Sequence, residues 1–439
     1  MENKSSEYIE EQRLRYSQYL LQHRALPSIM DGLKAAGRRV LWCAKDMKKY
    51  KSATLGGMCM PLHPHASPET TINTLTGPYT NNIPLLDGVG AFGTLLNPTG
   101  YGASRYTSVS VSKFTHDVIF KDIEIIPLKD NYDGTLLEPL HFLPLIPIVL
   151  LNPTEGIAIG FACNILSRSL DDIIKSQIKY LQQQPIKDSS PVFKNHRSIG
   201  KDTSGKWLFV GEFERKNSSI VTVTLIPYGI SFTKYINILN KLIEDNVIVD
   251  YIDKSGATIC IDVIHKRGVL NTLDDDMIRE RLLLVNAISE NMNMVNLDSK
   301  TVLSTNFIET IEIFTNWRLK WYVARYERLV TMITMDIQKY LDVLTAIKYN
   351  IGGIANTMHS RAELKEFLSE IDIKNIDYIA DLPVYRFTEN EKKKVEEALA
   401  NANAILLGYN ELLADESKRR KVYIVELKEV LRKYGKKVT

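Results

Sequence analysis

A chain of 439 residues is too long for one ordinary hydrophobic core, so we expect two to four domains. Its hydrophobic fraction of 44% and charged fraction of 24% are typical of a globular protein and exclude a largely disordered chain. The formal net charge of +3 is close to neutral and by itself indicates no particular partner.

Cysteine spacing and apolar runs predict a cytoplasmic protein without a membrane partner. The four cysteines lie far apart and form no CxxC pair, which predicts reduced thiols and no zinc site. The polar N-terminus has no feature of a signal peptide. The longest apolar run, residues 142–151, is interrupted by two prolines and is too short to span a bilayer.

The first two predicted helices border a strongly basic segment. Helical patterns cover residues 7–23 and, after an Asp-Gly break, a stretch that contains Arg38 and Arg39 near its start. Eight basic and two acidic residues between Arg24 and Lys51 give these 28 residues a local charge of +6. Such a segment indicates either a docking surface for a polyanion or a solvated helix face.

Tyr106 stands at the start of a predicted strand. Residues 52–105 are rich in Gly, Pro, Asn and Thr, which predicts loops and short helices, and residues 105–114 alternate as a strand does. A tyrosine hydroxyl has a pKa of about 10 and is a poor nucleophile without assistance. The adjacent Arg105 can stabilise a phenolate and hold a phosphate oxygen. The pair alone leaves a packing role and a catalytic role open.

Three short motifs have ordinary explanations. The segment Gly88–Gly93 matches GxGxxG, but it follows no hydrophobic strand and opens no helix, so we predict a loop and no dinucleotide site. Asp274–Asp276 precedes a helical pattern, where acidic side chains favour the helix start more than a metal. His63 and His65 flank a proline without further zinc ligands, which leaves a phosphate contact or a structural role.

The rest of the chain predicts an α/β region followed by two long helices. Residues 219–230 and 256–265 alternate as strands, and residues 233–246 form an amphipathic helix. Apolar residues then repeat at 4-3 spacing from Leu319 to Leu344 and again from Val395 to Leu413, which predicts two coiled-coil helices. A short helical segment between them (about 350–388) indicates an antiparallel arm with a dimerising tip, although an ordinary helical bundle also fits.

Before the second of these helices, Thr388 and Glu391 predict a capping box.

Taken in order, eight motifs resemble those of the DNA breakage-reunion subunit of type IIA topoisomerases, the gyrase A and topoisomerase IV family. The fourth of them resembles the active-site AxRYT of that family, and the resemblance covers nearly the whole chain. The motifs are RALPSIMDGLKAAGRRVL (24–41), HPH (63–65), GVGAFGT (88–94), ASRYT (103–107), NYDGT (131–135), EGIAIGFACNI (155–165), IPYGI (226–230) and DLPVYRFTENE (381–391).

The resemblance implies a role for each matching residue. Tyr106 would attack a backbone phosphate and become linked to the 5′ end of the broken strand, and Arg105 would stabilise that phosphate. His63 and His65 would bind or polarise the scissile phosphate. Ile157 would insert between base pairs and help to bend the duplex. The DNA backbone would be held by Arg24, Lys34, Arg38 and Arg39.

The resemblance also implies a helix-rich, multidomain α+β fold. Its parts would be an N-terminal helical arm (1–23), a winged-helix DNA-cleavage domain with the tyrosine (24–138), a tower domain (139–305), and a coiled-coil arm with an exit-gate dimerisation region (306–439). The chain would act as a homodimer on double-stranded DNA, because each tyrosine cuts one strand of the duplex.

The expected partner is a separate subunit with ATPase and TOPRIM modules. It would bind ATP and hold most of the Mg²⁺, because this chain shows no phosphate-binding loop and no carboxylate cluster. The complex would relax or decatenate DNA in the cytoplasm, or in the host cytoplasm if the chain is viral. The alternative is a catalytically silent DNA-binding protein, which would not need Arg105, Tyr106, His63 and the arginine pair together.

Overall fold

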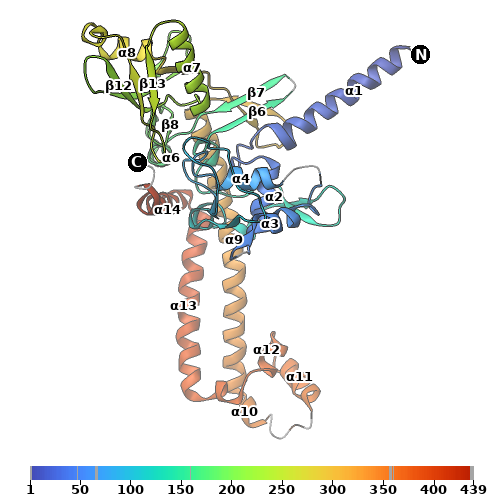
Figure 1. The fold of residues 1–439 in the computed structure, drawn as a ribbon. Coiled ribbons are helices and arrows are strands. Elements are labelled where there is room, and N and C mark those ends of the chain that lie inside the picture. The colour runs from blue at the N-terminus through green and yellow to red at the C-terminus, as the bar shows by residue number, and fades with distance from the viewer. Residues whose placement is uncertain are drawn as a thin grey trace. The chain divides into compact units, whose positions relative to one another are not determined.

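The computed structural model describes residues 2–46, 48–64, 68–158, 160–354, 358 and 360–435 (Figure 1). It divides into two compact units, one made of Met1–Arg318 with Ile424–Thr439 and the other of Leu319–Tyr423. Of the helices described, none is both long and apolar enough to cross a membrane.

The N-terminal part of the first unit consists of short helices and a small antiparallel sheet with strand order β1-β3-β2. In the second helix, Val40, Leu41 and Ala44 are buried, because residues spaced three and four apart share the face that packs on the core. The elements are α1 (Glu2–Leu20), the π-helical turn η1 (Leu21–Ala25), α2 (Ala35–Ala44), β1 (Tyr50–Lys51), α3 (Ser52–Cys59), α4 (Pro68–Thr76), β2 (Leu86–Val89), β3 (Ser108–Val111) and α5 (Lys113–Val118).

The apolar run at residues 142–151 lies in the core of the first unit, where most of its side chains are fully buried. Arg318 is buried against it, pairs with Asp122 and donates to the Pro144 carbonyl at 3.0 Å. The elements around this run are η2 (Ile123–Ile125), β4 (Leu128–Asp130), β5 (Leu137–Pro139), η3 (Ile148–Leu150), β6 (Thr154–Ala158), β7 (Phe161–Ile165) and α6 (Leu170–Leu181).

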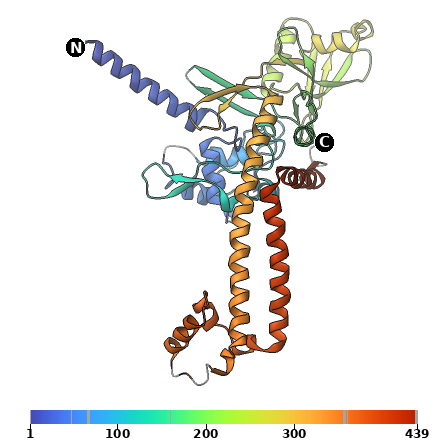
Figure 2. The same cartoon turned by 180° about the vertical axis from the view of Figure 1, so that it is seen from behind.

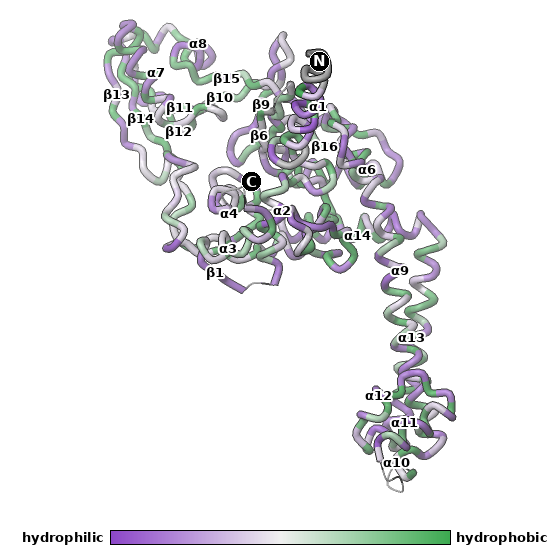
Figure 3. Tube along the Cα trace, turned by 90° about the vertical axis from the view of Figure 1, so that its right-hand side faces the viewer, coloured by the Kyte–Doolittle hydropathy of each residue, from purple (hydrophilic) through white to green (hydrophobic). Residues whose placement is uncertain are grey.

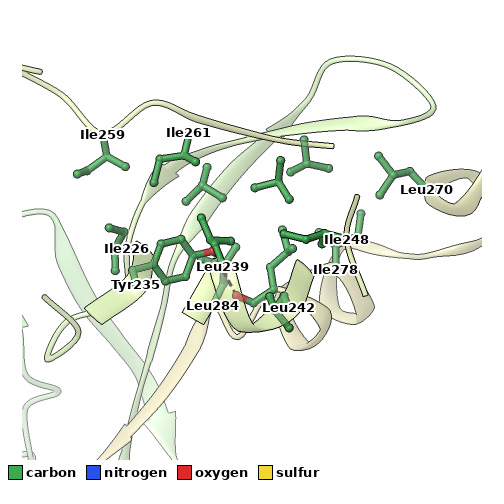
Figure 4. Packing of buried hydrophobic residues seen from close by; sticks show 14 residues of the cluster. Ile226, Tyr235, Leu239, Leu242, Ile248, Ile259, Ile261, Leu270, Ile278 and Leu284 are labelled. Carbon is green, nitrogen blue, oxygen red and sulfur yellow. Dashed lines mark hydrogen bonds between the residues drawn. The ribbon is translucent and has the colours of Figure 1, made fainter. Parts of the chain in front are cut away.

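Two four-stranded antiparallel sheets follow, with strand orders β15-β10-β9-β8 and β11-β12-β14-β13. Helix α7 packs its apolar face on the second sheet, where Tyr235 and Leu239 lie among buried aliphatic side chains (Figure 4). The elements are β8 (Val192–Phe193), β9 (His196–Lys201), β10 (Trp207–Val210), β11 (Glu212–Arg215), β12 (Ile220–Leu225), α7 (Phe232–Glu244), β13 (Asp250–Asp253), β14 (Ile261–Ile264), η4 (Val269–Thr272), α8 (Asp275–Arg281), β15 (Val285–Ile288), β16 (Met292–Val295) and β17 (Val302–Thr305).

These elements confirm three predictions for this region. Strands β12 and β14 lie within the segments predicted from alternation, and helix α7 begins one residue before the amphipathic segment predicted at 233–246. Asp274 is the N-cap of α8, where its side chain accepts a hydrogen bond from the Met277 N–H at 2.8 Å. The acidic run therefore starts a helix, as predicted.

The second unit contains most of one 42-residue helix and all of a 26-residue helix (Figure 2). The two helices run antiparallel. The ring centroids of Tyr326 and Tyr409 are 5.7 Å apart, whereas Val343, further along the first helix, shares a core cluster with Val395 near the start of the second. Hydrophobic and hydrophilic residues alternate along both (Figure 3). The elements are α9 (Phe307–Lys348), α10 (Ile351–Ile354), α11 (Arg361–Glu370), α12 (Ile376–Ala380), η6 (Val384–Phe387), α13 (Glu389–Ala414) and, mostly in the first unit, α14 (Glu416–Tyr434).

The predicted capping box at the start of α13 is wrong. Thr388 is the N-cap residue by backbone position, but its hydroxyl donates to the Tyr385 carbonyl at 3.0 Å. Glu391 accepts instead from the Arg386 guanidinium at 2.8 Å. Glu391 also accepts from the Lys394 ammonium at 2.6 Å, so both side chains of the predicted box are engaged with other partners.

Candidate active site

Tyr106 is an exposed residue at the end of a turn, directly before strand β3. Its backbone N–H donates to the Ala103 carbonyl at 2.9 Å, which closes the turn. Its side chain is 71% exposed, so it contributes little to the core. The Arg105 guanidinium lies over its ring, with the central carbon 4.8 Å from the ring centroid. The hydroxyl is therefore accessible to an external reactant beside a cation.

The backbone of this turn is fixed by its contacts with the start of α3. Thr107 is buried and its hydroxyl donates to the Ser52 hydroxyl at 2.7 Å, while the Ser52 N–H donates to the Thr107 carbonyl at 3.1 Å. The Lys51 ammonium donates to the Tyr106 carbonyl at 3.3 Å. An exposed side chain on a fixed backbone is the arrangement that a nucleophile requires.

The glycines of the GxGxxG segment shape a loop behind this turn. Gly90 has a φ of +115°, and a Cβ there would lie 3.4 Å from the Thr107 Cα. Gly93 has a φ of +96°, and a Cβ there would lie 2.3 Å from the Pro98 carbonyl oxygen. Residues 90–107, all of which are described, contain no helix. The loop predicted for Gly88–Gly93 is confirmed only from Gly90 onward, because Gly88 and Val89 belong to strand β2.

His63 lies between two aromatic side chains from distant segments. Its Nε2 is 3.1 Å from the Tyr19 hydroxyl at the end of α1, and its ring meets that of Tyr132 edge-on at 5.9 Å. It lines a cavity of about 750 Å³ together with Arg24 and Lys34. His65 lies outside the described residues.

Lys34 connects the start of α2 to the hairpin of β6 and β7. Its ammonium donates to the Glu155 carbonyl at 2.6 Å, and burial lowers its pKa. A Cβ on the neighbouring Gly156 would lie 2.1 Å from the Ala25 carbonyl oxygen, so the hairpin approaches η1 as closely as a glycine allows. Arg24, in η1, is exposed at the same junction.

Arg38 and Arg39 are paired with buried carboxylates that were not predicted from the sequence. Arg38 donates to both oxygens of the fully buried Asp31 at 2.6 and 3.0 Å, and Arg39 donates to both oxygens of Glu138 at 2.5 and 3.1 Å. Their side chains are only 11% and 12% exposed. Burial alone would raise the pKa of Glu138, but the Arg39 guanidinium outweighs burial and holds that pKa below its usual range.

These ion pairs give both arginines a structural role, and a contact with DNA stays a prediction for each. Asp31 stands seven residues before Arg38, within the Asp-Gly break, so the sequence could have suggested this ion pair. Glu138 is 99 residues from Arg39 and carries no comparable signal.

Ile157 has the most exposed large hydrophobic side chain among the residues described. It lies on β6, opposite Ala162 of β7, and is 90% exposed. Its side chain adds nothing to the core and is accessible to a partner.

The structure brings some of the predicted residues together and keeps others apart. Arg24, Lys34, Arg39 and His63 line the same cavity, whereas Tyr106 and its neighbour lie outside that lining. Within the described part of the chain, no three side chains of the types His, Cys, Asp and Glu gather closely enough to hold a metal ion. The predicted residues thus offer cations, imidazole and a phenol, but no metal-binding set.

The chain is similar in sequence to two groups of known proteins. The chain is 27% identical over 406 residues to the DNA topoisomerase medium subunit of Enterobacteria phage T4, covering 89% of this chain and 91% of the phage protein. It is 27% identical over 480 residues to the gyrase A protein of Brachyspira hyodysenteriae, covering 97% of this chain but only 56% of the gyrase protein.

A solved structure shows the same fold. The DNA-binding, cleavage and re-ligation domain of Plasmodium falciparum topoisomerase II matches 95% of this chain and 63% of that chain, with a TM-score of 0.82 at 20% identity. The family model for the A subunits of DNA gyrase and topoisomerase IV matches residues 24–428. Because this match includes almost the whole chain, the protein belongs to the family formed by the A subunits of DNA gyrase and topoisomerase IV.

Proposed function

We propose that the Tyr106 hydroxyl is the nucleophile with which this type II topoisomerase subunit cleaves one strand of double-stranded DNA. The observation that carries the proposal is the exposed Tyr106 side chain on a fixed turn, next to the Arg105 guanidinium. A packing residue would be buried, and an ordinary surface tyrosine would not need the contacts that fix this turn.

In the proposed reaction, the Tyr106 oxygen attacks a backbone phosphorus and the phosphorus–O3′ bond breaks. The phenolic proton passes to water, the O3′ takes up a proton, and the 5′ phosphate stays on the tyrosine. The reverse attack by the 3′ hydroxyl reseals the strand, because the phosphotyrosyl bond conserves the free energy of the phosphodiester bond that was broken. Arg105 stabilises the negative charge that develops on the phosphate oxygens.

The same proposal assigns the DNA contacts. Ile157 inserts between base pairs, because its exposed aliphatic side chain suits a partly unstacked base step. His63 and His65 contact the scissile phosphate. The cationic residues that hold the DNA backbone are Arg24, Lys34, Arg38 and Arg39.

The proposed complex needs a second copy and a second kind of chain. Two copies, joined through the tips of their arms, cut both strands. The domain boundaries at residues 23, 138 and 305 follow from the family resemblance. A partner subunit with ATPase and TOPRIM modules binds ATP and holds the Mg²⁺, which would stabilise charge at the scissile phosphate. The complex acts on cytoplasmic DNA and relaxes or decatenates it.

The test is covalent DNA capture by the complex purified with its partner subunit. After Mg²⁺, duplex DNA and a detergent quench, wild type is expected to form an adduct and Tyr106→Phe none, with DNA affinity changed by less than about twofold because only one hydroxyl is lost. Tyr101→Phe, on the loop before the turn, is the control and keeps the adduct. An adduct that persists in Tyr106→Phe would show that another residue is the nucleophile.

A further inference from the structure

The last turn of α1 places a tyrosine hydroxyl on the imidazole of His63. The Tyr19 oxygen lies 3.1 Å from His63 Nε2, although the two residues are 44 positions apart in the sequence. This contact was not predicted, because α1 was expected only as a helical arm. It makes α1 a part of the site.

A hydrogen bond of this kind determines which ring nitrogen carries the proton. When the Tyr19 hydroxyl donates to Nε2, the neutral imidazole carries its proton on Nδ1; when the imidazole is charged, the hydroxyl accepts from Nε2. The edge-on ring of Tyr132, 5.9 Å away, fixes the plane of the imidazole from another side. Together the two tyrosines set the orientation and the proton position of His63.

The surroundings of this pair favour an anionic ligand. Tyr19 and His63 line the same cavity of about 750 Å³ as Arg24, Lys34 and Arg39. Arg39 is paired with Glu138, and Glu155 also lines the cavity, so the cations that can attract a phosphate group are Arg24 and Lys34. An oriented imidazole can then donate to one of the phosphate oxygens.

We propose that Tyr19 is a positioning residue for His63, and that α1 thereby adjusts the rate of DNA cleavage without contributing to DNA affinity. The inference rests on the proposed function, since it assigns His63 to the scissile phosphate. It extends that function by making the N-terminal helix part of the cleavage machinery.

The test is a double-mutant cycle on the complex with its partner subunit. Tyr19→Phe, His63→Ala and the double variant are compared in single-turnover adduct formation at saturating DNA, and DNA affinity is measured separately. Tyr19→Phe keeps the ring and removes only the hydroxyl. The control is Tyr8→Phe, because Tyr8 is exposed on the same helix and does not line the cavity.

We expect Tyr19→Phe to slow adduct formation about five- to tenfold, the loss typical of one hydrogen bond, with DNA affinity unchanged within about twofold. In the His63→Ala background the same substitution is expected to have no further effect, because Tyr19 acts through His63. Tyr8→Phe is expected to match wild type.

Three results would overturn the inference: a wild-type rate in Tyr19→Phe, an equal loss in the His63→Ala background, or the same loss in Tyr8→Phe. Failure of the proposed function has a different signature. In that case wild type itself forms no adduct, or forms one that Tyr106→Phe retains.

Discussion

Arg38 and Asp31 form a two-point ion pair at the start of α2, with N–O distances of 2.6 and 3.0 Å. Asp31 also accepts the backbone N–H of Phe142 at 3.1 Å, so one fully buried carboxylate connects α2 to the apolar core segment. Removal of the guanidinium would leave this carboxylate buried without its counter-ion.

Arg38→Ala is therefore expected to lower the free energy of unfolding by about 3 to 5 kcal/mol, the loss typical of a broken buried ion pair. Denaturant unfolding measures this loss. If Arg38 also contacts a phosphate, the salt dependence of DNA binding falls by about one unit of slope. Arg38→Lys is the control and keeps the slope. If Arg38→Ala loses stability but keeps the salt dependence of DNA binding, Arg38 has a structural role and contacts no phosphate.

Ile157→Ala is expected to leave stability unchanged within about 0.5 kcal/mol, because the side chain is exposed and packs against nothing that its loss would open. It is expected to reduce DNA bending, as measured by fluorescence transfer between dyes at the two ends of a short duplex. Ile199→Ala changes another exposed isoleucine, on β9, and serves as the control. Equal DNA bending by wild type, Ile157→Ala and Ile199→Ala would contradict an insertion of Ile157 into DNA.

The tip of the second unit carries two exposed apolar side chains, Val384 and Tyr385, in the turn η6 before α13. Charged substitutions there, Val384→Asp with Tyr385→Asp, are expected to weaken self-association at least tenfold in sedimentation equilibrium, since a buried interface does not tolerate unpaired charge. Leu407→Asp, at an exposed position along α13, is the control. A dimer of unchanged strength would contradict a contact through this tip.

His196 predicts a pH dependence of stability. Burial lowers its pKa to about 4, and its Nδ1 is buried without a hydrogen-bond partner in the described structure. An unfolded histidine has a pKa of about 6.5, so the unfolded state binds more protons between these values, and stability falls as the pH falls from about 6.5 to about 4.

The full loss for this one group is on the order of 3 kcal/mol. His196→Phe, which keeps a ring next to Tyr228, is expected to remove that part of the pH dependence in denaturant titrations. The same slope in the variant would assign the dependence to other groups.

Periodicity predicted the regular elements well, because helix and strand spacing depend on the sequence nearby. The long helices α9 and α13, helix α7 and strands β12 and β14 all follow from such spacing. The strand predicted for residues 105–114 was less accurate, because β3 covers only Ser108–Val111. Tyr106 lies in the turn before it, and Lys113 and Phe114 already belong to helix α5.

The side-chain partners could not be predicted in the same way. The contact of Tyr19 with His63 and that of Arg39 with Glu138 join segments 44 and 99 residues apart, and no local pattern encodes them. The capping box at Thr388 failed although its motif is present, because the Thr388 hydroxyl donates to the Tyr385 carbonyl and makes no cap hydrogen bond.

The most direct measurement is to identify the residue that becomes linked to DNA. The detergent-quenched adduct, formed by the complex with its partner subunit on end-labelled duplex, is digested with protease and nuclease and sequenced by mass spectrometry. The account predicts a peptide with a nucleotide joined through its 5′ phosphate to Tyr106, which is exposed beside Arg105. A nucleotide on another residue, or one joined through its 3′ phosphate, would contradict it.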